Sequence, residues 1–144
     1  MPKLTSVLLV DDDSTTNYLN KLLLNRLGVA EHLLVAENGR EALPILAQTC
    51  RATNTSCPPL ILLDVNMPLM NGFEFLVAYR ELPPALQSAT VVVMLTTSLH
   101  PRDVARAQSL PVAGFLTKPL TAAKVTEIIQ GHFAGTLAAP IPEN

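Results

Sequence analysis

Four short apolar runs in this chain each lead into a polar side chain, and segments with helical patterns separate the runs. Apolar runs of this length are typical of strands buried on both faces of a parallel sheet. Because the carboxyl ends of parallel strands share one edge, polar groups distant in sequence converge there. The sequence therefore predicts a shallow site with three carboxylates, a hydroxyl and an ammonium group. The runs and their polar groups are Val7 to Val10 with Asp11 and Asp12, Leu60 to Leu63 with Asp64, Val91 to Leu95 with Thr96, and Gly114 to Thr117 with Lys118.

Strand and helix patterns alternate five times, which favours an α/β fold. Right-handed crossovers then place helices on both faces of a parallel sheet, so we expect a three-layer sandwich of five βα units. The expected strands are Leu4 to Val10, His32 to Ala36, Leu60 to Leu63, Val91 to Leu95 and Val112 to Leu116. The expected helices are Ser14 to Leu27, a second from the cap pair Asn38 and Glu41 to about Thr49, a third capped by Asn71 and Glu74 and ended by Pro83, a fourth with Pro101 in its first turn, and a last one capped by Thr121.

Side-chain patterns within three helices make further predictions. In the first helix four leucines share one face, namely Leu19, Leu22, Leu23 and Leu27. Pro44 follows the first turn of the second helix and should kink or loosen it. In the last helix Val125, Ile128 and Ile129 are expected to point inward.

Composition favours one soluble domain. Of the 144 residues 49% are hydrophobic and 15% charged, and the net charge is −2. This balance argues against disorder and against nonspecific nucleic-acid binding. No apolar stretch approaches the roughly 18 residues of a membrane span, and no signal peptide is visible, so we expect a cytoplasmic location. Cys50 and Cys57 are expected to be free thiols. We expect a domain over residues 1–133 and a flexible tail over 134–144.

The converging residues suit phosphoryl chemistry. Asp11 and Asp12 offer the hard oxygens that Mg²⁺ prefers, and Asp64 could complete the metal shell and act as a nucleophile on phosphorus. The Lys118 ammonium would neutralise phosphoryl charge, and the Thr96 hydroxyl can donate to a phosphoryl oxygen. Taken singly, each residue is more simply explained as a helix cap, a turn residue or a solvated charge. Their joint placement at strand ends favours a functional site.

Four stretches of the sequence resemble a response-regulator receiver domain of two-component signalling. They are VLLVDDD at 7–13, LILLDVNMPLMNG at 60–72, VVVMLTTS at 91–98 and GFLTKPL at 114–120. The resemblance implies a flavodoxin-like fold with strand order 2-1-3-4-5, an order for which a member of this family is a standard example. It implies Asp64 as phospho-acceptor. The other implied roles are metal binding by Asp11, Asp12, Asp64 and the Asn66 backbone carbonyl, catalysis by Thr96 and Lys118, an aromatic switch at Phe115 coupled to Thr96, and a cis bond before Pro119.

The same resemblance implies partners and a mode of action. A histidine kinase or phosphotransfer protein would donate the phosphoryl group, and a downstream protein would bind the face made by the fourth predicted helix, fifth strand and fifth predicted helix. The domain would assist its own phosphorylation and dephosphorylation without being an enzyme in the usual sense. At Thr97 the chain departs from the common family pattern, which has a small residue there. Asn66 and Ser98 occupy positions at which the family tunes hydrolysis of the phosphorylated aspartate.

Two other interpretations compete with the receiver. Asp11, Asp13 and Thr15 match the D-x-D-x-T pattern of haloacid-dehalogenase-like phosphatases, but those enzymes need a further acidic motif after the lysine. Beyond Lys118 the chain offers only Glu127 and Glu143, and this alternative leaves Asp64 unexplained. A receiver fold that has lost phosphorylation is disfavoured, because every acidic and switch position is filled. The histidines, His32, His100 and His132, are too scattered for a zinc site or phosphohistidine relay.

Overall fold

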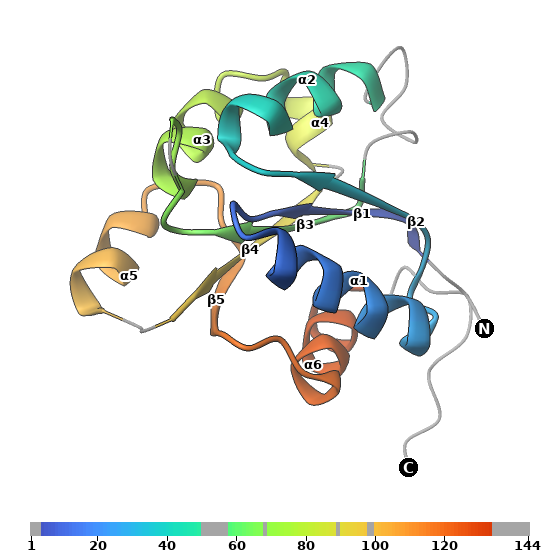
Figure 1. Ribbon diagram of the computed structural model, residues 1–144. Helices are drawn as coiled ribbons and strands as arrows, with labels where there is room; N and C mark the ends of the chain where they lie inside the picture. Colours follow the sequence, from blue (N-terminus) through green and yellow to red (C-terminus); the bar gives the residue numbers. More distant parts are fainter. Residues whose placement is uncertain (1–3, 50–57, 68, 89, 98–99, 134–144) are drawn as a thin grey trace.

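Five parallel strands form one sheet in the order β2-β1-β3-β4-β5, which confirms the predicted order (Figure 1). The computed structural model describes residues 4–49, 58–67, 69–88, 90–97 and 100–133. Every neighbouring strand pair is parallel, so each connection must cross over one face of the sheet. The strands are β1 (Leu4–Val10), β2 (Ala30–Ala36), β3 (Leu60–Asp64), β4 (Val91–Thr96) and β5 (Gly114–Thr117).

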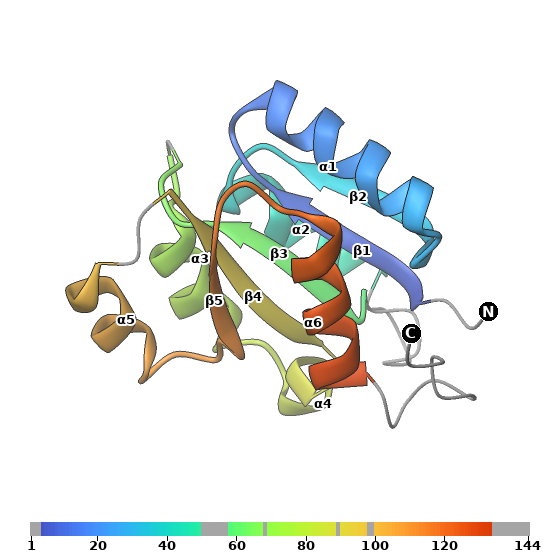
Figure 2. The ribbon, with the colours of Figure 1, turned by 90° about the horizontal axis from the view of Figure 1, so that it is seen from below.

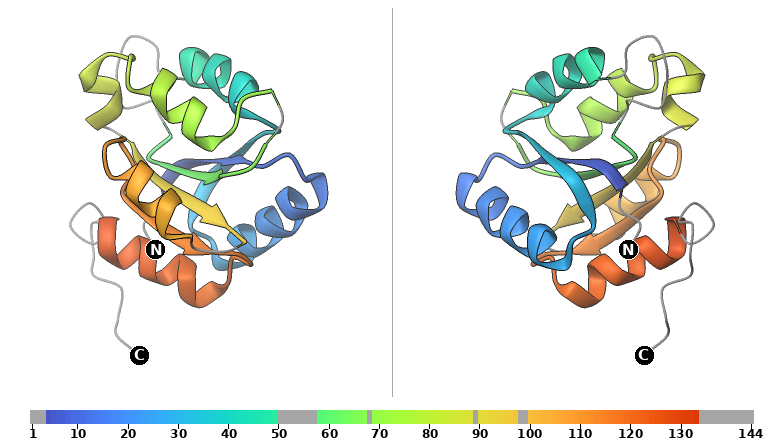
Figure 3. Two further views of the ribbon diagram at one scale, coloured as in Figure 1. Left: turned by 90° about the vertical axis from the view of Figure 1, so that its left-hand side faces the viewer. Right: turned by 90° about the vertical axis from the view of Figure 1, so that its right-hand side faces the viewer.

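Helices cover both faces of the sheet, as predicted for a three-layer sandwich (Figures 1 and 3). One face carries α1 (Ser14–Leu27) and α6 (Ala122–Phe133). The other carries α2 (Gly39–Thr49), α3 (Gly72–Tyr79) and α5 (Pro101–Ala107), and the short α4 (Pro84–Ser88) follows α3. Figure 2 views the sheet from the side of α1 and α6.

Successive side chains of the central strands pack into two separate cores, because strand side chains alternate between faces. Val10, Leu63 and Met94 pack with α2, α3 and α5. Their neighbours Leu9 and Leu62 pack with α1 and α6. All five side chains are at most 2% exposed, so the strands are buried on both faces as their unbroken apolar sequences predicted.

Three predicted helix caps are present. Asn71 accepts from the Glu74 N–H at 2.9 Å, and the Glu74 carboxylate accepts from the Asn71 N–H at 2.9 Å, which completes a capping box. The Asn38 side chain accepts from the Glu41 N–H at 3.0 Å. The Thr121 hydroxyl accepts from the N–H three residues on, at 3.2 Å. Each cap supplies an acceptor for an N–H that a helix start leaves unpaired.

Several element boundaries differ from the prediction. Strand β2 begins at Ala30 rather than His32, and β5 spans Gly114–Thr117 rather than Val112 to Leu116. Helix α3 ends at Tyr79, and α4 was not predicted. Helix α2 runs through Pro44 without interruption, with this proline on its exposed side. The predicted inward residues of the last helix, Val125, Ile128 and Ile129, are buried.

The leucine face predicted for α1 is only partly buried: Leu23 and Leu27 are half-buried and pack against the core under α1 and α6. Leu19 and Leu22 are 56% and 49% exposed, whereas Asn17, Asn20 and Leu24 are buried. Asn17 and Asn20 lie on the buried side of α1, so an apolar periodicity does not identify that side. Leu19 and Leu22 therefore form an exposed apolar stripe on α1.

Some predictions fall on residues outside the described ranges. These are the thiols of Cys50 and Cys57, the role of Ser98, and the tail over 134–144. Among the described helices, none combines the length and the apolar character needed to cross a lipid bilayer.

Candidate functional site

The strand register brings the predicted site residues to one edge of the sheet. Val10 of β1 pairs with Leu63 of β3, and Asp64 pairs with Leu95 of β4. At the next step Thr96 pairs with Thr117, the residue before Lys118. The ends of β1, β3, β4 and β5 therefore meet, as predicted from the polar groups that follow the four apolar runs.

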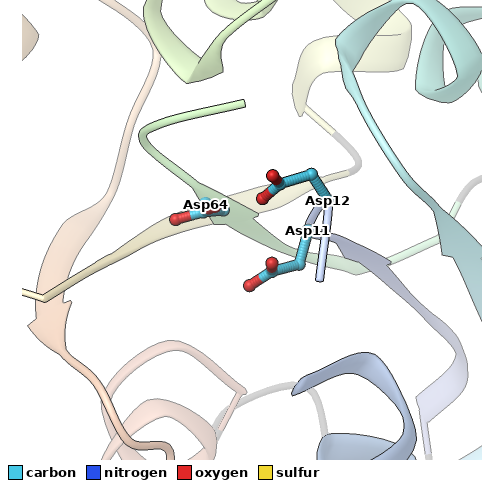
Figure 4. Close-up of side chains that lie close together, drawn as sticks. All are labelled: Asp11, Asp12 and Asp64. Atoms are coloured by element: carbon cyan, nitrogen blue, oxygen red, sulfur yellow. The ribbon is translucent and has the colours of Figure 1, made fainter. Parts of the chain in front are cut away.

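Asp11, Asp12 and Asp64 form an acidic cluster at this edge (Figure 4). One carboxylate oxygen of each residue lies within 4.8 Å of the others. Asp11 and Asp64 are 4% and 7% exposed, and Asp12 is exposed to solvent. The cluster thus has a buried floor and an open side through which a ligand can reach it.

Lys118 lies between the two buried carboxylates. Its Nζ is 2.7 Å from Asp11 Oδ2 and 3.1 Å from Asp64 Oδ1. Its backbone N–H donates to the Thr96 carbonyl at 2.7 Å, which joins the loop after β5 to the end of β4. One ammonium group therefore serves two of the three carboxylates.

Burial and neighbouring charges alter the acid–base behaviour of Asp64 and Lys118. Burial and the negative charge of Asp11 raise the pKa of Asp64 to about 6, although Lys118 opposes this shift. Burial disfavours the charged form of Lys118, but hydrogen bonds and attraction to Asp11 and Asp64 outweigh it and raise the lysine pKa above its ordinary value. Lys118 stays cationic at neutral pH, while the negative charge on Asp64 is costly without a further cation.

The donor set of the acidic cluster fits a hard divalent cation. All three ligand atoms are carboxylate oxygens, the donors that Mg²⁺ and Ca²⁺ prefer. Among the described residues, the three carboxylates of the cluster are accompanied by one ammonium, that of Lys118, so negative charge is in excess. Burial raises the pKa of Asp64, and the charges of Asp11 and Asp12 add to this effect. A bound cation would relieve the excess of negative charge. The exposed side of Asp12 leaves room for the waters that Mg²⁺ retains.

Thr96 and Phe115 occupy neighbouring positions on adjacent strands, as predicted. Met94 pairs with Phe115 and Thr96 pairs with Thr117, which puts Thr96 and Phe115 diagonally across one face. Thr96 is buried, and the half-buried Phe115 ring packs against the core under α2, α3 and α5. A movement of one side chain can therefore change the space available to the other.

The Asp13 carboxylate is not part of the acidic cluster and is engaged at the start of α1. It accepts from the Thr15 N–H at 3.1 Å and from the Thr16 hydroxyl at 2.8 Å, and so caps α1. These bonds, the Thr16 bond first, lower the pKa of Asp13 below its ordinary value. The phosphatase alternative needs the carboxylates of Asp11 and Asp13 to act together, whereas the Asp13 carboxylate is used as a helix cap and lies outside the acidic cluster. Asn66 follows β3 with an exposed side chain, and its carbonyl remains a predicted ligand.

Sequence patterns missed Asn17, which supports the site. Asn17 is buried, and its Nδ2 donates to the Asp11 carbonyl at 2.8 Å. This bond holds the backbone directly after β1 to helix α1. Asn17 Oδ1 has no hydrogen-bond partner within the part of the chain that the structure describes. The only signal in the sequence was a polar residue at an inward helical position, which no apolar periodicity reveals.

A groove of about 410 Å³ begins beside Lys118 and runs along α1. The exposed Leu19 and Leu22 and the half-buried Leu23 of α1 form one wall. Pro119 and Leu120 of the loop after β5 contribute to the other. The acidic cluster is thus flanked by an apolar surface on the α1 side.

Known proteins share both this sequence pattern and this fold. A family model described as response regulator receiver domain matches residues 7–130. Response regulator Rcp1 from Synechocystis is 33% identical over 125 residues, which cover 87% of this chain and 84% of that protein. Protein PilH from Pseudomonas aeruginosa is 30% identical over 130 residues, covering 90% of this chain and 98% of that protein.

Solved structures agree with the sequence comparisons. A two-component response regulator from Cytophaga hutchinsonii superimposes with a TM-score of 0.80 at 30% identity, over 90% of this chain and 96% of that one. The chemotaxis protein CheY4 from Vibrio cholerae gives a TM-score of 0.71 at 32% identity, over 89% of this chain and 98% of that one. With its parallel sheet and its acidic edge beside a lysine, the chain belongs to the response regulator receiver domain family, the signalling domains of two-component systems.

Proposed function

We propose that Asp64 accepts a phosphoryl group from a phosphohistidine donor and that the phosphorylated domain changes its affinity for a protein partner. One observation carries the proposal: Asp64 ends a buried strand, opens toward two further carboxylates and is bonded to Lys118 at 3.1 Å. A carboxylate in this setting is a candidate nucleophile with its charge neutraliser already in place.

In the proposed transfer, an Asp64 carboxylate oxygen attacks the donor phosphorus. A P–O bond to Asp64 forms as the P–N bond to the donor histidine breaks, and the imidazole nitrogen leaves and takes up a proton. The Lys118 ammonium holds the attacking carboxylate and balances charge on the phosphoryl oxygens. Asp11 and Asp64 are buried, so the donor phosphorus has to approach Asp64 from the solvent-exposed side of the cluster.

Mg²⁺ is the proposed cofactor, held by Asp11, Asp12, Asp64 and the backbone carbonyl of Asn66. When bound it would supply positive charge that keeps Asp64 ionised and neutralises phosphoryl oxygens. The excess of carboxylates over ammonium groups in the cluster supports this assignment.

The donor is proposed to be a histidine kinase or a phosphotransfer protein. The sensor kinase/phosphatase LuxN from Vibrio harveyi is 35% identical to this chain over 116 residues, which cover 12% of that protein. This match within a sensor kinase supports a histidine kinase as the donor. The apolar groove extends from Lys118 along α1, away from the acidic cluster. A protein donor can contact this groove while its phosphohistidine reaches Asp64, so the groove supports a protein donor over a small molecule. A donor charged by ATP implies the cytoplasm as the place of reaction.

The proposed switch couples Thr96 to Phe115. A phosphoryl group on Asp64 offers strong acceptors, and the Thr96 hydroxyl gains by moving toward them. The space it leaves lies beside Phe115, whose ring could then turn inward and reshape the surface of α5, β5 and α6. These are the fourth predicted helix, the fifth strand and the fifth predicted helix, so this surface is the proposed docking face for the target.

Intact mass spectrometry after incubation with acetyl phosphate and Mg²⁺ tests the proposed function. The wild-type protein should gain the mass of one phosphoryl group, and Asp64→Asn should gain none. Asp103→Asn on α5, an aspartate outside the acidic cluster, is the matched control and should be labelled normally. Equal labelling of Asp64→Asn and wild type would show that another group is the acceptor.

A further inference from the structure

Lys124, in the first turn of α6, holds the loop that carries Lys118. Its Nζ donates to the Thr117 carbonyl at 2.6 Å, to Thr117 Oγ1 at 3.3 Å and to the Pro119 carbonyl at 3.1 Å. An ammonium group has three N–H donors, and these acceptors satisfy all three. Two of them are the carbonyls of the residues directly before and after Lys118.

Contacts from four elements, β4, β1, β3 and α6, meet at this loop. From β4, the Thr96 carbonyl accepts from the Lys118 N–H at 2.7 Å. From β1 and β3, Asp11 and Asp64 bind the Lys118 ammonium. Lys124 adds the connection to α6. This connection is separate from the helix cap, because the cap uses the backbone N–H of Lys124 and the Thr121 hydroxyl.

We propose that Lys124 is a positioning residue for phosphoryl transfer, which sets the backbone on either side of Lys118 so that its ammonium reaches Asp11 and Asp64 together. Lys124 acts through the loop, since its side-chain bonds go to Thr117 and Pro119 rather than to a carboxylate. It is half-buried, so these charge-assisted bonds are partly shielded from water. The rate consequence rests on the proposed function of Asp64, whereas the loop contact does not.

Lys124→Met tests the role, because methionine fills a similar volume without a donor or a charge. A small misplacement of a reacting group costs up to roughly 100-fold in rate, and for a loop that keeps its bond to Thr96 we expect a loss of about tenfold. The rate is that of Asp64 labelling by acetyl phosphate at saturating Mg²⁺. The Mg²⁺ midpoint from thermal titration should stay within about twofold, since Asp11 and Asp12 are untouched.

A second readout separates positioning from general stability. In Lys124→Met the Lys118 amide should exchange with solvent deuterium at least about tenfold faster, while the amides of β1 and β3 keep their protection. Lys124→Arg retains a cation with several donors and should restore most of both the rate and the protection. Lys21→Met on α1 removes the same charge elsewhere and should change neither.

The outcomes are distinct. If Lys124→Met matches wild type within about twofold in both rate and Lys118 amide exchange, the positioning role is wrong. If all core amides lose protection together, Lys124 serves stability alone and the proposal is equally overturned. If the wild-type protein takes up no phosphoryl group, the proposed function fails instead, and amide exchange still decides whether Lys124 orders the loop.

Discussion

Replacing Asp64 with asparagine should stabilise the metal-free protein at neutral pH. In the folded state the pKa of Asp64 is about 6, against an ordinary value of 3.8. The folded domain therefore holds this proton more tightly than the unfolded chain does, and its contribution to stability is full below pH 3.8 and is lost as pH rises through 6. The difference of about two units, at 1.36 kcal/mol each, amounts to about 3 kcal/mol at pH 7.5.

The asparagine amide carries no charge at any pH, so the variant escapes this cost. In urea unfolding with a chelator, Asp64→Asn should be more stable than wild type by about 3 kcal/mol at pH 7.5 and by about 1 kcal/mol at pH 4.5. For a chain of this size the neutral-pH gain corresponds to roughly 6–12 °C in melting temperature. Asp103→Asn, in the first turn of α5, should change stability by less than about 1 kcal/mol at pH 7.5.

The pH dependence decides whether electrostatic strain is the cause. A gain that stays constant between pH 7.5 and 4.5 would refute the reasoning, because better packing of the amide would not follow the titration of a carboxyl group. A loss of stability at pH 7.5 would refute it more directly. It would mean that the bond of Asp64 to Lys118 outweighs burial and the repulsion from Asp11.

Three further predictions follow from the site and its supports. Mg²⁺ should stabilise the protein by about 1.4 kcal/mol at ten times its Kd, and Asp12→Asn should weaken this gain and slow labelling of Asp64; a melting curve unmoved by millimolar Mg²⁺ would exclude the site. Thr96→Ala should still accept phosphate but lose the affinity change toward the partner, measured with and without beryllofluoride, and an undiminished affinity change would rule out this route. Gly72→Ala should cost about 1–3 kcal/mol in urea unfolding, because its Cβ would lie 2.5 Å from the Asp64 carbonyl oxygen. Gly131→Ala in α6 meets no described atom within 4 Å and should instead stabilise by roughly 0.5–1 kcal/mol, so equal effects of the two substitutions would contradict the packing argument.

Local signals predicted the parts of the fold that neighbouring residues determine. The Asn71–Glu74 capping box could be predicted because both partners lie within one helical turn. The sheet edge could be predicted because apolar runs identify buried strands and topology places their ends together. Strand order itself came from the family resemblance, since periodicity does not specify which strands are adjacent.

What the sequence could not show depends on contacts between distant or chemically unlike groups. The Lys124 side chain donates mainly to backbone carbonyls, which every residue possesses, so no side-chain pattern in the sequence predicts these hydrogen bonds. The inward line of α1 includes Asn17, which is buried because it donates to the Asp11 carbonyl. An apolar pattern assigns such a residue to the surface. Helix α4, Pro84–Ser88, is too short to give a periodic signal.

The charge balance of this site, three carboxylates and the Lys118 ammonium among the described residues, also limits how a signal can leave it. With all groups ionised, Asp11, Asp12, Asp64 and Lys118 sum to −2, and a divalent cation brings the sum to zero. Exchanging the −1 of Asp64 for a phosphorylated group of about −2 then changes the total by only about one unit. Salt at physiological strength screens such a change beyond roughly 8 Å. A partner must therefore sense a rearranged surface rather than an altered field, and its phosphorylation-linked gain in affinity should survive added salt.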